Sequence, residues 1–321
     1  MTRSILRVVF FGTAEFAVPS LVALLEAGHE VLAVVTQPDK PQGRGMQLSP
    51  SPVKREAERR DLLVLQPRRV RHESFLAKMR EFAPDVLALA AFGQIVPQAL
   101  LDLPRLGPIN VHGSLLPRYR GAAPIQRAIM AGETEMGVTT MWMDATLDTG
   151  DMLLSAALPI NAEDTAGTLT PKLAYLGANL LVETLEGLDA GTLVRRPQDS
   201  TQATLAPALT PEDGHIRWHE PAQSIVNRIR GVSPKPGAYT LVRGKRVKIW
   251  VAEDAQLTSE SVPGSVLGLS KHPPGLLVAA GEHTTLRLLE NQPDSGKRMP
   301  ANAWANGLRL TTADRFDPDP D

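Results

Sequence analysis

The sequence contains no cysteine among its 321 residues. This absence excludes disulfides, thiol nucleophiles and cysteine-based zinc sites, and it is compatible with a reducing compartment. An excess of charge is missing as well, since 34 Lys and Arg residues stand against 35 Asp and Glu residues. The overall charge therefore predicts no nucleic-acid or membrane partner, and any such partner would have to meet a local patch.

Long apolar runs are also missing. The opening stretch MTRSILRVVFFG has too short an apolar run for a signal peptide, and residues 86–92 fall far short of the roughly 20 apolar residues of a membrane helix. We therefore expect a cytoplasmic protein with no membrane partner. At about 150 residues per domain, the chain is long enough for two domains.

Apolar runs alternate with helical patterns in the first part of the chain. Continuous rather than alternating apolar strands are typical of a parallel sheet covered on both faces, which predicts a Rossmann-like α/β domain over residues 1–191. The strands are expected at 5–11, 31–36, 62–65, 86–91, 109–111 and 138–142, and the helices at 19–27, 53–60, 73–82, 124–131 and 168–188.

The texture of the sequence changes after residue 191. Residues 192–208 are polar with two prolines and no clear period, which is typical of a linker. A helix at 221–230 and short β-rich runs separated by Gly and Pro predict a small, OB-like β-barrel over 209–312. These runs lie at 239–242, 246–252, 265–269, 276–280 and 285–289, and we expect a disordered tail at 313–321.

The stretch NVHGSLLPRYRGAAPIQRA begins at Asn110 and places an amide and an imidazole two residues apart. On a strand, Asn110 and His112 would point to the same side at its carboxyl end, where open α/β sheets place their ligand sites. Taken alone, Asn110 could cap the strand and His112 could be a satisfied polar residue. A carboxylate could come from Asp148 or Asp151 in LDTGDM, for which an Asp-Gly turn without a catalytic role is the alternative.

Motifs of other enzyme classes are missing. There is no G-x-S-x-G, and Ser114 lies too near His112 for an ordinary Ser-His-Asp triad. No G-x-G-x-x-G follows the first strand, and we expect no metal site. Acid-base and oxyanion chemistry remain: an amide that donates to a developing oxyanion, an imidazole that donates or transfers a proton, and a carboxylate that tunes it.

NVHGSLLPRYRGAAPIQRA followed by LDTGDM resembles the signature of the folate-dependent formyltransferases. FFGTAEFAVPSL, TQPDKPQGRG, PSPVK and AAFGQIVP extend the resemblance over nearly the full length. It implies transfer of the formyl group of 10-formyltetrahydrofolate to the α-amino group of methionine on the initiator tRNA, by a monomer. The family's catalytic residues fall on Asn110, His112 and Asp148, and the implied folate contacts are Ser114, Leu115, Leu116, Pro117, Phe92 and Gly93.

Two features bear on the acceptor. The loop QPDKPQGRGMQLSPSP is longer than an ordinary strand-to-helix connection, and in the family it enters the acceptor stem, with Arg44 matching the key arginine. Met46 and Gln47 stand where family members commonly have lysines. The second feature is a basic stretch at 221–252 with no acidic residue, typical of a surface that follows a phosphate backbone. The expected tRNA contacts are Lys40, Arg44, Lys54, Arg230, Lys245, Arg246 and Lys248.

Alternatives remain for both features and for the activity. The loop could be a mobile surface loop, and the basic residues could simply solvate a β face. A formyltransferase that acts on a small amine, such as a nucleotide-linked amino sugar, would need neither feature. An RNA-binding module without activity would give Asn110, His112 and Asp148 no reason to coexist.

Overall fold

The computed structural model describes residues 4–42 and 47–317 and separates into two compact units. The first unit consists of Met1–Pro124, Glu135–Leu158 and Thr170–Ala206, and the second of Ile125–Thr134, Pro159–Leu169 and Pro207–Asp321. Both are discontinuous in sequence, whereas the expected domains, 1–191 and 209–312, were continuous. These domain boundaries remain predictions.

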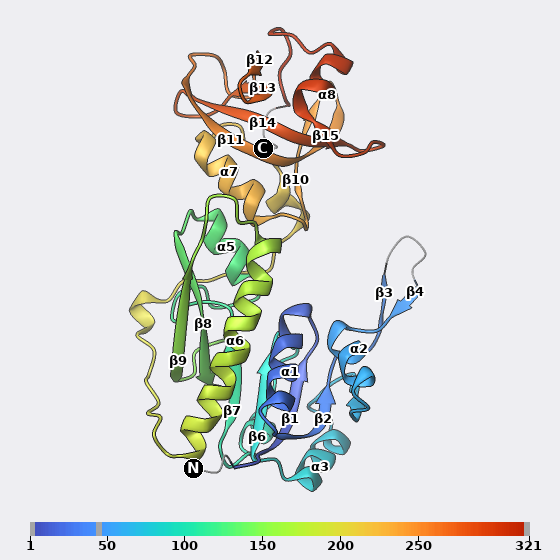
Figure 1. Ribbon diagram of the computed structural model, residues 1–321, viewed down its shortest axis with the longest axis vertical. Coiled ribbons are helices and arrows are strands. Elements are labelled where there is room, and N and C mark those ends of the chain that lie inside the picture. Colours follow the sequence, from blue (N-terminus) through green and yellow to red (C-terminus); the bar gives the residue numbers. More distant parts are fainter. Residues whose placement is uncertain (1–3, 43–46, 318–321) are drawn as a thin grey trace. The chain divides into compact units, whose positions relative to one another are not determined.

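The first unit is built around a seven-stranded sheet in the order β5-β2-β1-β6-β7-β8-β9 (Figure 1). The strands from β5 to β7 run parallel, in the order of a Rossmann half-fold, and β8 is antiparallel to β7. The central parallel strands β1, β6 and β7 are largely buried apolar runs, as the sequence predicted, whereas β2 is buried only in its second half and β5 is half-buried. The strands are β1 (Arg7–Gly12), β2 (Glu30–Val35), β5 (Val64–Leu65), β6 (Val86–Ala90), β7 (Pro108–His112), β8 (Glu135–Trp142) and β9 (Met152–Pro159).

Helices follow most of these strands and begin where the sequence signals a start. The side chain of Ser51 caps one of them by accepting a hydrogen bond from the Lys54 backbone N–H, and Pro52 occupies its first turn. The elements are η1 (Glu15–Ala17), α1 (Val18–Glu26), α2 (Pro52–Arg59), α3 (Glu73–Phe82), α4 (Gln98–Leu101), α5 (Pro124–Met130) and α6 (Ala166–Asp189). The expected helices are confirmed, with small shifts at their ends.

Several elements of the first part of the chain were not expected. Strand β9 alternates between more buried and exposed residues, because it lies at the edge of the sheet. The loop between β2 and α2 contains a short hairpin of β3 (Lys40–Gln42) and β4 (Gln47–Ser49). The four-residue helix α4 is too short to give a helical period in the sequence.

The second unit contains an antiparallel sheet in the order β10-β11-β14-β13-β12, with β15 paired to β14. Helices α7 and α8 pack against this sheet, and Trp218, Ile225 and Trp304 belong to the shared apolar core. The elements are η3 (Pro211–Gly214), α7 (Ala222–Gly231), β10 (Ala238–Val242), β11 (Lys245–Thr258), β12 (Val266–Lys271), β13 (Pro274–Ala279), β14 (Thr284–Pro293), β15 (Met299–Pro300) and α8 (Ala301–Leu308). Helix α8 was not expected.

The expected disordered tail is wrong for residues 313–317. Phe316 is fully buried and stacks on Trp218 with ring centroids 4.9 Å apart. Phe316 also forms a β-bridge to Val242 at the end of β10, and Arg315 forms one to Ser265, just before β12. The two edge strands of the sheet are thus linked through the end of the described chain, which is compatible with a small barrel. Residues 318–321 lie outside the described residues.

The segment 192–208 also has defined contacts. Arg196 forms a β-bridge with Met152, and Leu205 forms one with Arg120. Between them, η2 (Ser200–Gln202) begins with a cap in which the Asp199 side chain accepts from the Thr201 backbone N–H. The segment up to Ala206 therefore packs along the first unit rather than serving only as a spacer.

Candidate active site

His112 is the last residue of β7 and lies at the carboxyl edge of the sheet. It is 6% exposed. Its Nε2 is 2.9 Å from the carbonyl oxygen of Tyr119, and its Nδ1 is 3.6 Å from Oδ2 of Asp148. Because both ring nitrogens face oxygen atoms, each can carry a proton directed at an acceptor.

Asp148 lies in the turn between β8 and β9, and its backbone is in the left-handed region with φ 53°. Its Oδ2 accepts a hydrogen bond of 2.8 Å from the Gly121 backbone N–H, while its Oδ1 has no hydrogen-bond partner among the residues that the structure describes. Gly150, in the same turn, must be glycine because a Cβ there would collide with the carbonyl of Trp142. The turn thus holds one carboxylate oxygen in place and leaves the other available.

Asp151, the second carboxylate that the sequence offered, points elsewhere. Its Oδ2 accepts a hydrogen bond of 2.9 Å from Nε of Arg195. The structure therefore brings Asp148, and not Asp151, to His112.

Asn110 lies two residues before His112 on β7 and shares its side of the strand. Its side chain is half-buried, and it makes no hydrogen bond with residues 4–42 or 47–317. An amide that has no protein partner at the carboxyl edge of the sheet is free to donate to a bound substrate.

The segment from Ser114 to Pro117 turns away from the end of β7. Ser114 is fully buried and donates from Oγ to the carbonyl of Arg118 at 2.6 Å. Thr139 of β8 bridges the segment, because its Oγ1 donates to the Ser114 carbonyl and accepts from the Leu116 N–H. The Ser114 hydroxyl is therefore already used within the protein, whereas Leu115 and Pro117 are half-buried.

The two other expected folate contacts follow β6. The ring of Phe92 is 5% exposed and packs edge-on against Phe11 with centroids 5.3 Å apart, so it belongs to the core. Gly93 is exposed and has φ 79°, and its carbonyl accepts from the side chain of Gln37 at 2.9 Å. Of these two residues, Gly93 is the one with an accessible backbone at the edge of the sheet.

In and beside the loop between β2 and α2, Lys40 and Lys54 are bound by neighbouring side chains of the protein. Lys54 forms an ion pair of 2.7 Å with Asp39, and the hydrogen bond from Lys54 is the largest cause that holds the pKa of Asp39 below its ordinary value. Lys40 donates from Nζ to the side chain of Gln37 at 2.6 Å. Arg44 and Met46 lie outside the described residues, so the expected contact of Arg44 with tRNA stays a prediction.

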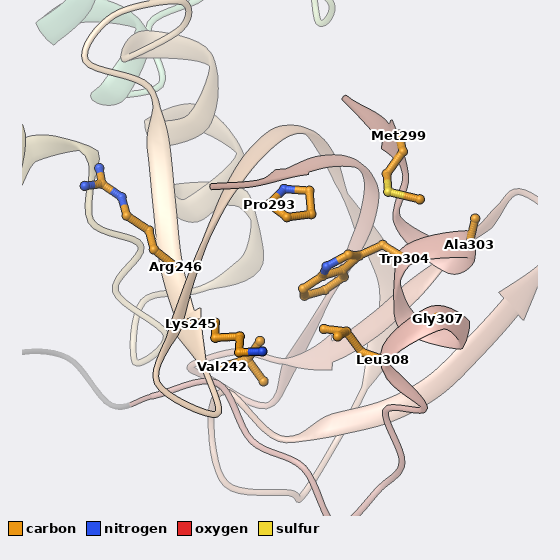
Figure 2. Close-up of a pocket in the computed structure, with 9 residues that line it drawn as sticks. All are labelled: Val242, Lys245, Arg246, Pro293, Met299, Ala303, Trp304, Gly307 and Leu308. Carbon is orange, nitrogen blue, oxygen red and sulfur yellow. The ribbon is translucent and has the colours of Figure 1, made fainter. Parts of the chain in front are cut away.

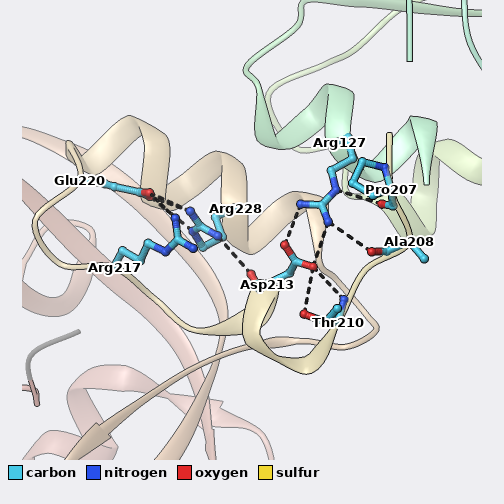
Figure 3. Close-up of polar contacts among 8 residues, drawn as sticks. All are labelled: Arg127, Pro207, Ala208, Thr210, Asp213, Arg217, Glu220 and Arg228. Atoms are coloured by element: carbon cyan, nitrogen blue, oxygen red, sulfur yellow. Dashed lines mark hydrogen bonds and ion pairs between the residues drawn. The ribbon is translucent and has the colours of Figure 1, made fainter. Parts of the chain in front are cut away.

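Several of the basic residues of 221–252 are engaged by carboxylates or carbonyls of the second unit. Arg228 pairs with Glu220 at 2.8 Å, as Figure 3 shows, and Arg243 pairs with Asp314 at 2.7 Å. Arg230 donates to the carbonyls of Asp164 and Asn161, and burial lowers the pKa of its guanidinium. These arginines are bound within the protein.

Fewer basic residues of 221–252 are left without a carboxylate partner than the sequence indicated, and among them Lys245 and Arg246 are exposed and Lys248 is half-buried. Lys245, Arg246 and Lys248 form no ion pair within the described part of the chain. Arg246 lies over the ring of Tyr239 at 3.7 Å, and Lys248 lies 5.9 Å from the ring centroid of Trp250. Cations that are supported by aromatic rings and not neutralised by carboxylates are suited to phosphate contacts.

A pocket of about 350 Å³ lies beside these residues in the second unit. Figure 2 shows Trp304, Met299 and Leu308 along its wall, while the Arg246 side chain points away from Trp304. All residues that line this pocket belong to the second unit, whereas the catalytic residues proposed from the sequence belong to the first.

A second polar network lies within the second unit (Figure 3). Asp213 accepts two hydrogen bonds from Arg127 of α5, at 2.7 and 3.0 Å, and a third from the Thr210 backbone N–H. Arg127 also donates to the carbonyls of Pro207 and Ala208. These contacts tie α5 to the segment that begins the C-terminal part of the chain.

In the described part of the chain, no helix is both long and apolar enough to cross a membrane. Residues 4–42 and 47–317 contain no group of three or more His, Asp or Glu side chains placed to hold a metal ion. The expectation of a reaction without a metal rests on the sequence alone.

Comparisons with known proteins define the class of this enzyme. The family model described as "Formyl transferase" matches residues 6–185, and the model described as "Formyl transferase, C-terminal domain" matches residues 208–309. The chain belongs to the formyl transferase family.

Within this family, the relatives described next are all methionyl-tRNA formyltransferases. The chain is 52% identical to the methionyl-tRNA formyltransferase of Koribacter versatilis, over 96% of this chain and 97% of that protein. It is also 52% identical to the methionyl-tRNA formyltransferase of Caldanaerobacter subterraneus, over 95% of this chain and 98% of that protein. Within the family, the chain groups with the methionyl-tRNA formyltransferases.

Solved structures share the fold at low sequence identity. The N-formyltransferase from Helicobacter canadensis, in complex with folinic acid and dTDP-3-aminofucose, has a TM-score of 0.64 at 18% identity, over 89% of this chain and 99% of that chain. HypX from Aquifex aeolicus, in complex with tetrahydrofolic acid, has a TM-score of 0.62 at 17% identity, over 95% of this chain and 48% of that chain. At these identities the likeness concerns the fold alone.

Proposed function

We propose that the protein transfers the formyl group of 10-formyltetrahydrofolate to the α-amino group of methionine on the initiator tRNA. The observation that carries the reaction is the pairing of His112 with Asp148 beside Asn110, at the carboxyl edge of the sheet. The observation that carries the acceptor is 52% identity, over nearly the whole chain, to proteins named methionyl-tRNA formyltransferase.

The first chemical step is attack of the neutral amine on the formyl carbon. The new C–N bond turns the formyl oxygen into an oxyanion, to which the unengaged amide of Asn110 donates. A single preorganised donor of this kind lowers a barrier by about 3 to 4 kcal/mol. His112 is the second donor in the proposal, and its Nε2–H reaches the oxyanion only by leaving or sharing its bond to the Tyr119 carbonyl.

The amine must lose a proton as the intermediate breaks down. Asp148 Oδ1 is the acceptor, directly or through water, because Oδ2 is held by Gly121. Cleavage of the bond between the formyl carbon and N10 of the folate then needs a proton on that nitrogen. His112, opposite Asp148, can pass it on, so the proton taken from the amine balances the proton gained by the folate.

The folate is expected to lie where the ends of β6 and β7 meet, between Gly93 and the segment from Ser114 to Pro117. Both follow neighbouring parallel strands, whose carboxyl ends form one edge of the sheet. Support comes from two structures with this fold that were solved in complex with folate compounds, tetrahydrofolic acid in one and folinic acid in the other.

The second candidate function is formyl transfer to a nucleotide-linked amino sugar. The Helicobacter canadensis N-formyltransferase, solved in complex with such a sugar, has this fold but only 18% identity. The exposed cations of the β10–β11 hairpin favour tRNA, since a small nucleotide sugar does not need an extended basic surface.

A competition assay tests the proposal. The purified protein is mixed with 10-formyltetrahydrofolate and either aminoacylated initiator tRNA or dTDP-3-aminofucose, and the formylated products are measured by mass spectrometry. We expect N-formylmethionyl-tRNA as the product, and a KM for tRNA that rises with salt. The logarithm of the association constant for tRNA should fall with the logarithm of the salt concentration, with a slope of about −0.9 per phosphate contact. Formylated sugar without formylated tRNA would overturn the assignment of the acceptor.

A further inference from the structure

Gln198 connects the turn that carries Asp148 to a buried arginine. Its Nε2 donates to the carbonyl oxygens of Asp148 and Gly150, at 2.8 and 2.7 Å. Its Oε1 accepts from Nε and Nη2 of Arg120, at 3.0 and 2.8 Å. Gln198 comes from the segment 192–208, for which the sequence indicated no part in the reaction.

The orientation of the Gln198 amide follows from the groups around it. A guanidinium carries only donors, so the amide oxygen must face Arg120. The carbonyls of Asp148 and Gly150 are acceptors, so the amide NH₂ must face them. A rotated amide would set donors against donors and an oxygen against two oxygens, which leaves one favoured arrangement.

Arg120 is itself fixed on both sides by backbone bonds. It is 8% exposed, its N–H donates to the Thr204 carbonyl at 2.8 Å, and its carbonyl accepts from the Ala206 N–H at 2.7 Å. The next residue, Gly121, donates to the Asp148 carboxylate. Arg120 is thus connected through Gln198 to the backbone carbonyl of Asp148. Gly121 is connected directly to the side chain of Asp148.

The conformation of Asp148 needs such support. A non-glycine residue at positive φ is strained and persists only where its surroundings hold it. The Gly121 bond alone would leave the backbone of the turn free to rotate the carboxylate away from His112. The two bonds from Gln198 act on the backbone on both sides of Thr149.

We infer that Gln198 is a positioning residue for formyl transfer. It holds the Asp148 carboxylate opposite His112 and does not touch either substrate. The inference rests on the proposed function, because the position of Asp148 affects a rate only if Asp148 takes part in the reaction.

Three variants test the role of Gln198. Gln198→Glu keeps acceptor oxygens for Arg120 but has no hydrogens for the two carbonyls, whereas Gln198→Ala removes both sets of bonds. Gln202→Ala is the matched control, because Gln202 is an exposed glutamine of the same segment that bonds only Asp199. We expect the Glu and Ala variants to lose about 10- to 100-fold in kcat, with each KM within about twofold, and the control to keep wild-type kcat.

A double-mutant cycle with Asp148→Asn shows through which residue Gln198 acts. We expect Gln198→Glu to change kcat by less than about twofold in the Asp148→Asn background, because the group that it positions is already impaired. Wild-type kcat in Gln198→Glu would overturn the inference and leave the proposed function intact. The same conclusion would follow if the double variant lost kcat by the full product of the two single-variant factors. A wild-type protein that forms no N-formylmethionyl-tRNA would instead overturn the proposed function.

Discussion

Two regions of the molecule are completed by segments that the sequence marked as unstructured, and they are completed in opposite ways. At the candidate active site, Gln198 adds directed hydrogen bonds to the turn of Asp148. In the second unit, Phe316 adds a buried ring beside Trp218 and bridges β10. The first segment contributes polar groups at fixed positions, and the second contributes apolar area.

The difference indicates what each region needs. A reacting group must be held in orientation, which hydrogen bonds with defined donors and acceptors provide. A small sheet must remove apolar surface from water, which a buried aromatic ring does without a preferred polar partner. We therefore expect substitutions in the first region to change rates and substitutions in the second to change stability.

The largest expected effect is on the apolar side of this comparison. Phe316→Ala should lower the free energy of unfolding by about 3 to 5 kcal/mol, because it leaves a cavity between aromatic side chains. Urea denaturation measures the loss. Leu269→Ala is the control, since Leu269 is 46% exposed, and its loss should stay below about 0.5 kcal/mol. Equal losses in both variants would contradict the burial of Phe316.

On the polar side, His112→Ala and Asp148→Asn should each lower kcat by about 100-fold or more, which corresponds to about 2.7 kcal/mol of barrier. Folate binding, measured by isothermal titration, should survive because neither side chain is expected to hold the folate. Asp151→Asn is the matched control, because this neighbouring carboxylate is engaged by Arg195. Near-normal turnover in either site variant would rule out its catalytic role.

Asp213 tests whether a polar contact can also stabilise the second unit. Burial alone would raise the pKa of Asp213, but hydrogen bonds from Arg127 and Thr210 outweigh it and lower the pKa below its ordinary value of 3.8. A depressed folded-state pKa means that this stabilisation is present above the ordinary value and is lost as the pH falls through the lowered one.

Asp213→Asn should therefore cost about 1 to 3 kcal/mol of unfolding free energy at pH 7. The difference between wild type and variant should shrink as the pH falls below 3.8. Thermal unfolding of wild type and variant, from pH 7 to below 3.8, measures the loss of unfolding free energy and its dependence on pH. A difference that is constant with pH would show that the Asp213 charge does not contribute.

The smallest effect is expected at the cations of the β10–β11 hairpin that form no ion pair within the described part of the chain. Lys245→Ala combined with Lys248→Ala should raise the KM for tRNA about threefold to tenfold and reduce the salt slope by about 2, at unchanged kcat. Arg243→Ala should leave the slope unchanged, because Arg243 is paired with Asp314. An unchanged slope in the double variant would place the tRNA surface elsewhere.

Local sequence patterns predicted much of the scaffold. The strands at the centre of the first sheet are continuous apolar runs because both faces are covered, and α3 has the predicted bounds because its periodicity is clear. Asn110 and His112 could be placed on one side of a strand end, because side chains alternate along a strand. Helix α8, strand β9 and the hairpin of β3 and β4 had no comparable signal.

The number of basic residues in the sequence did not show which of them are free to contact tRNA and which are bound by groups of the protein itself. Arg228, Arg230 and Arg243 lie in the same basic stretch as Lys245, but all three are bound to carboxylates or carbonyls outside that stretch or at its edge. The partner of Arg228 is eight residues away, whereas those of Arg230 and Arg243 are 66 and 71 residues away. Charge is a property of the residue, whereas its partner depends on which segments meet in the fold.

The sequence by itself determined most of the elements, the strand end that carries Asn110 and His112, and, through its resemblance, the family and reaction. The resemblance also named Asp148 as the catalytic carboxylate. Only the tertiary structure decided how Asp148 lies against His112, that Gln198 supports it, and that Phe316 is buried. The physical reason is range. Periodicity and motifs act between residues a few positions apart, whereas Gln198 and Asp148 are separated by 50 positions and meet only when the chain folds.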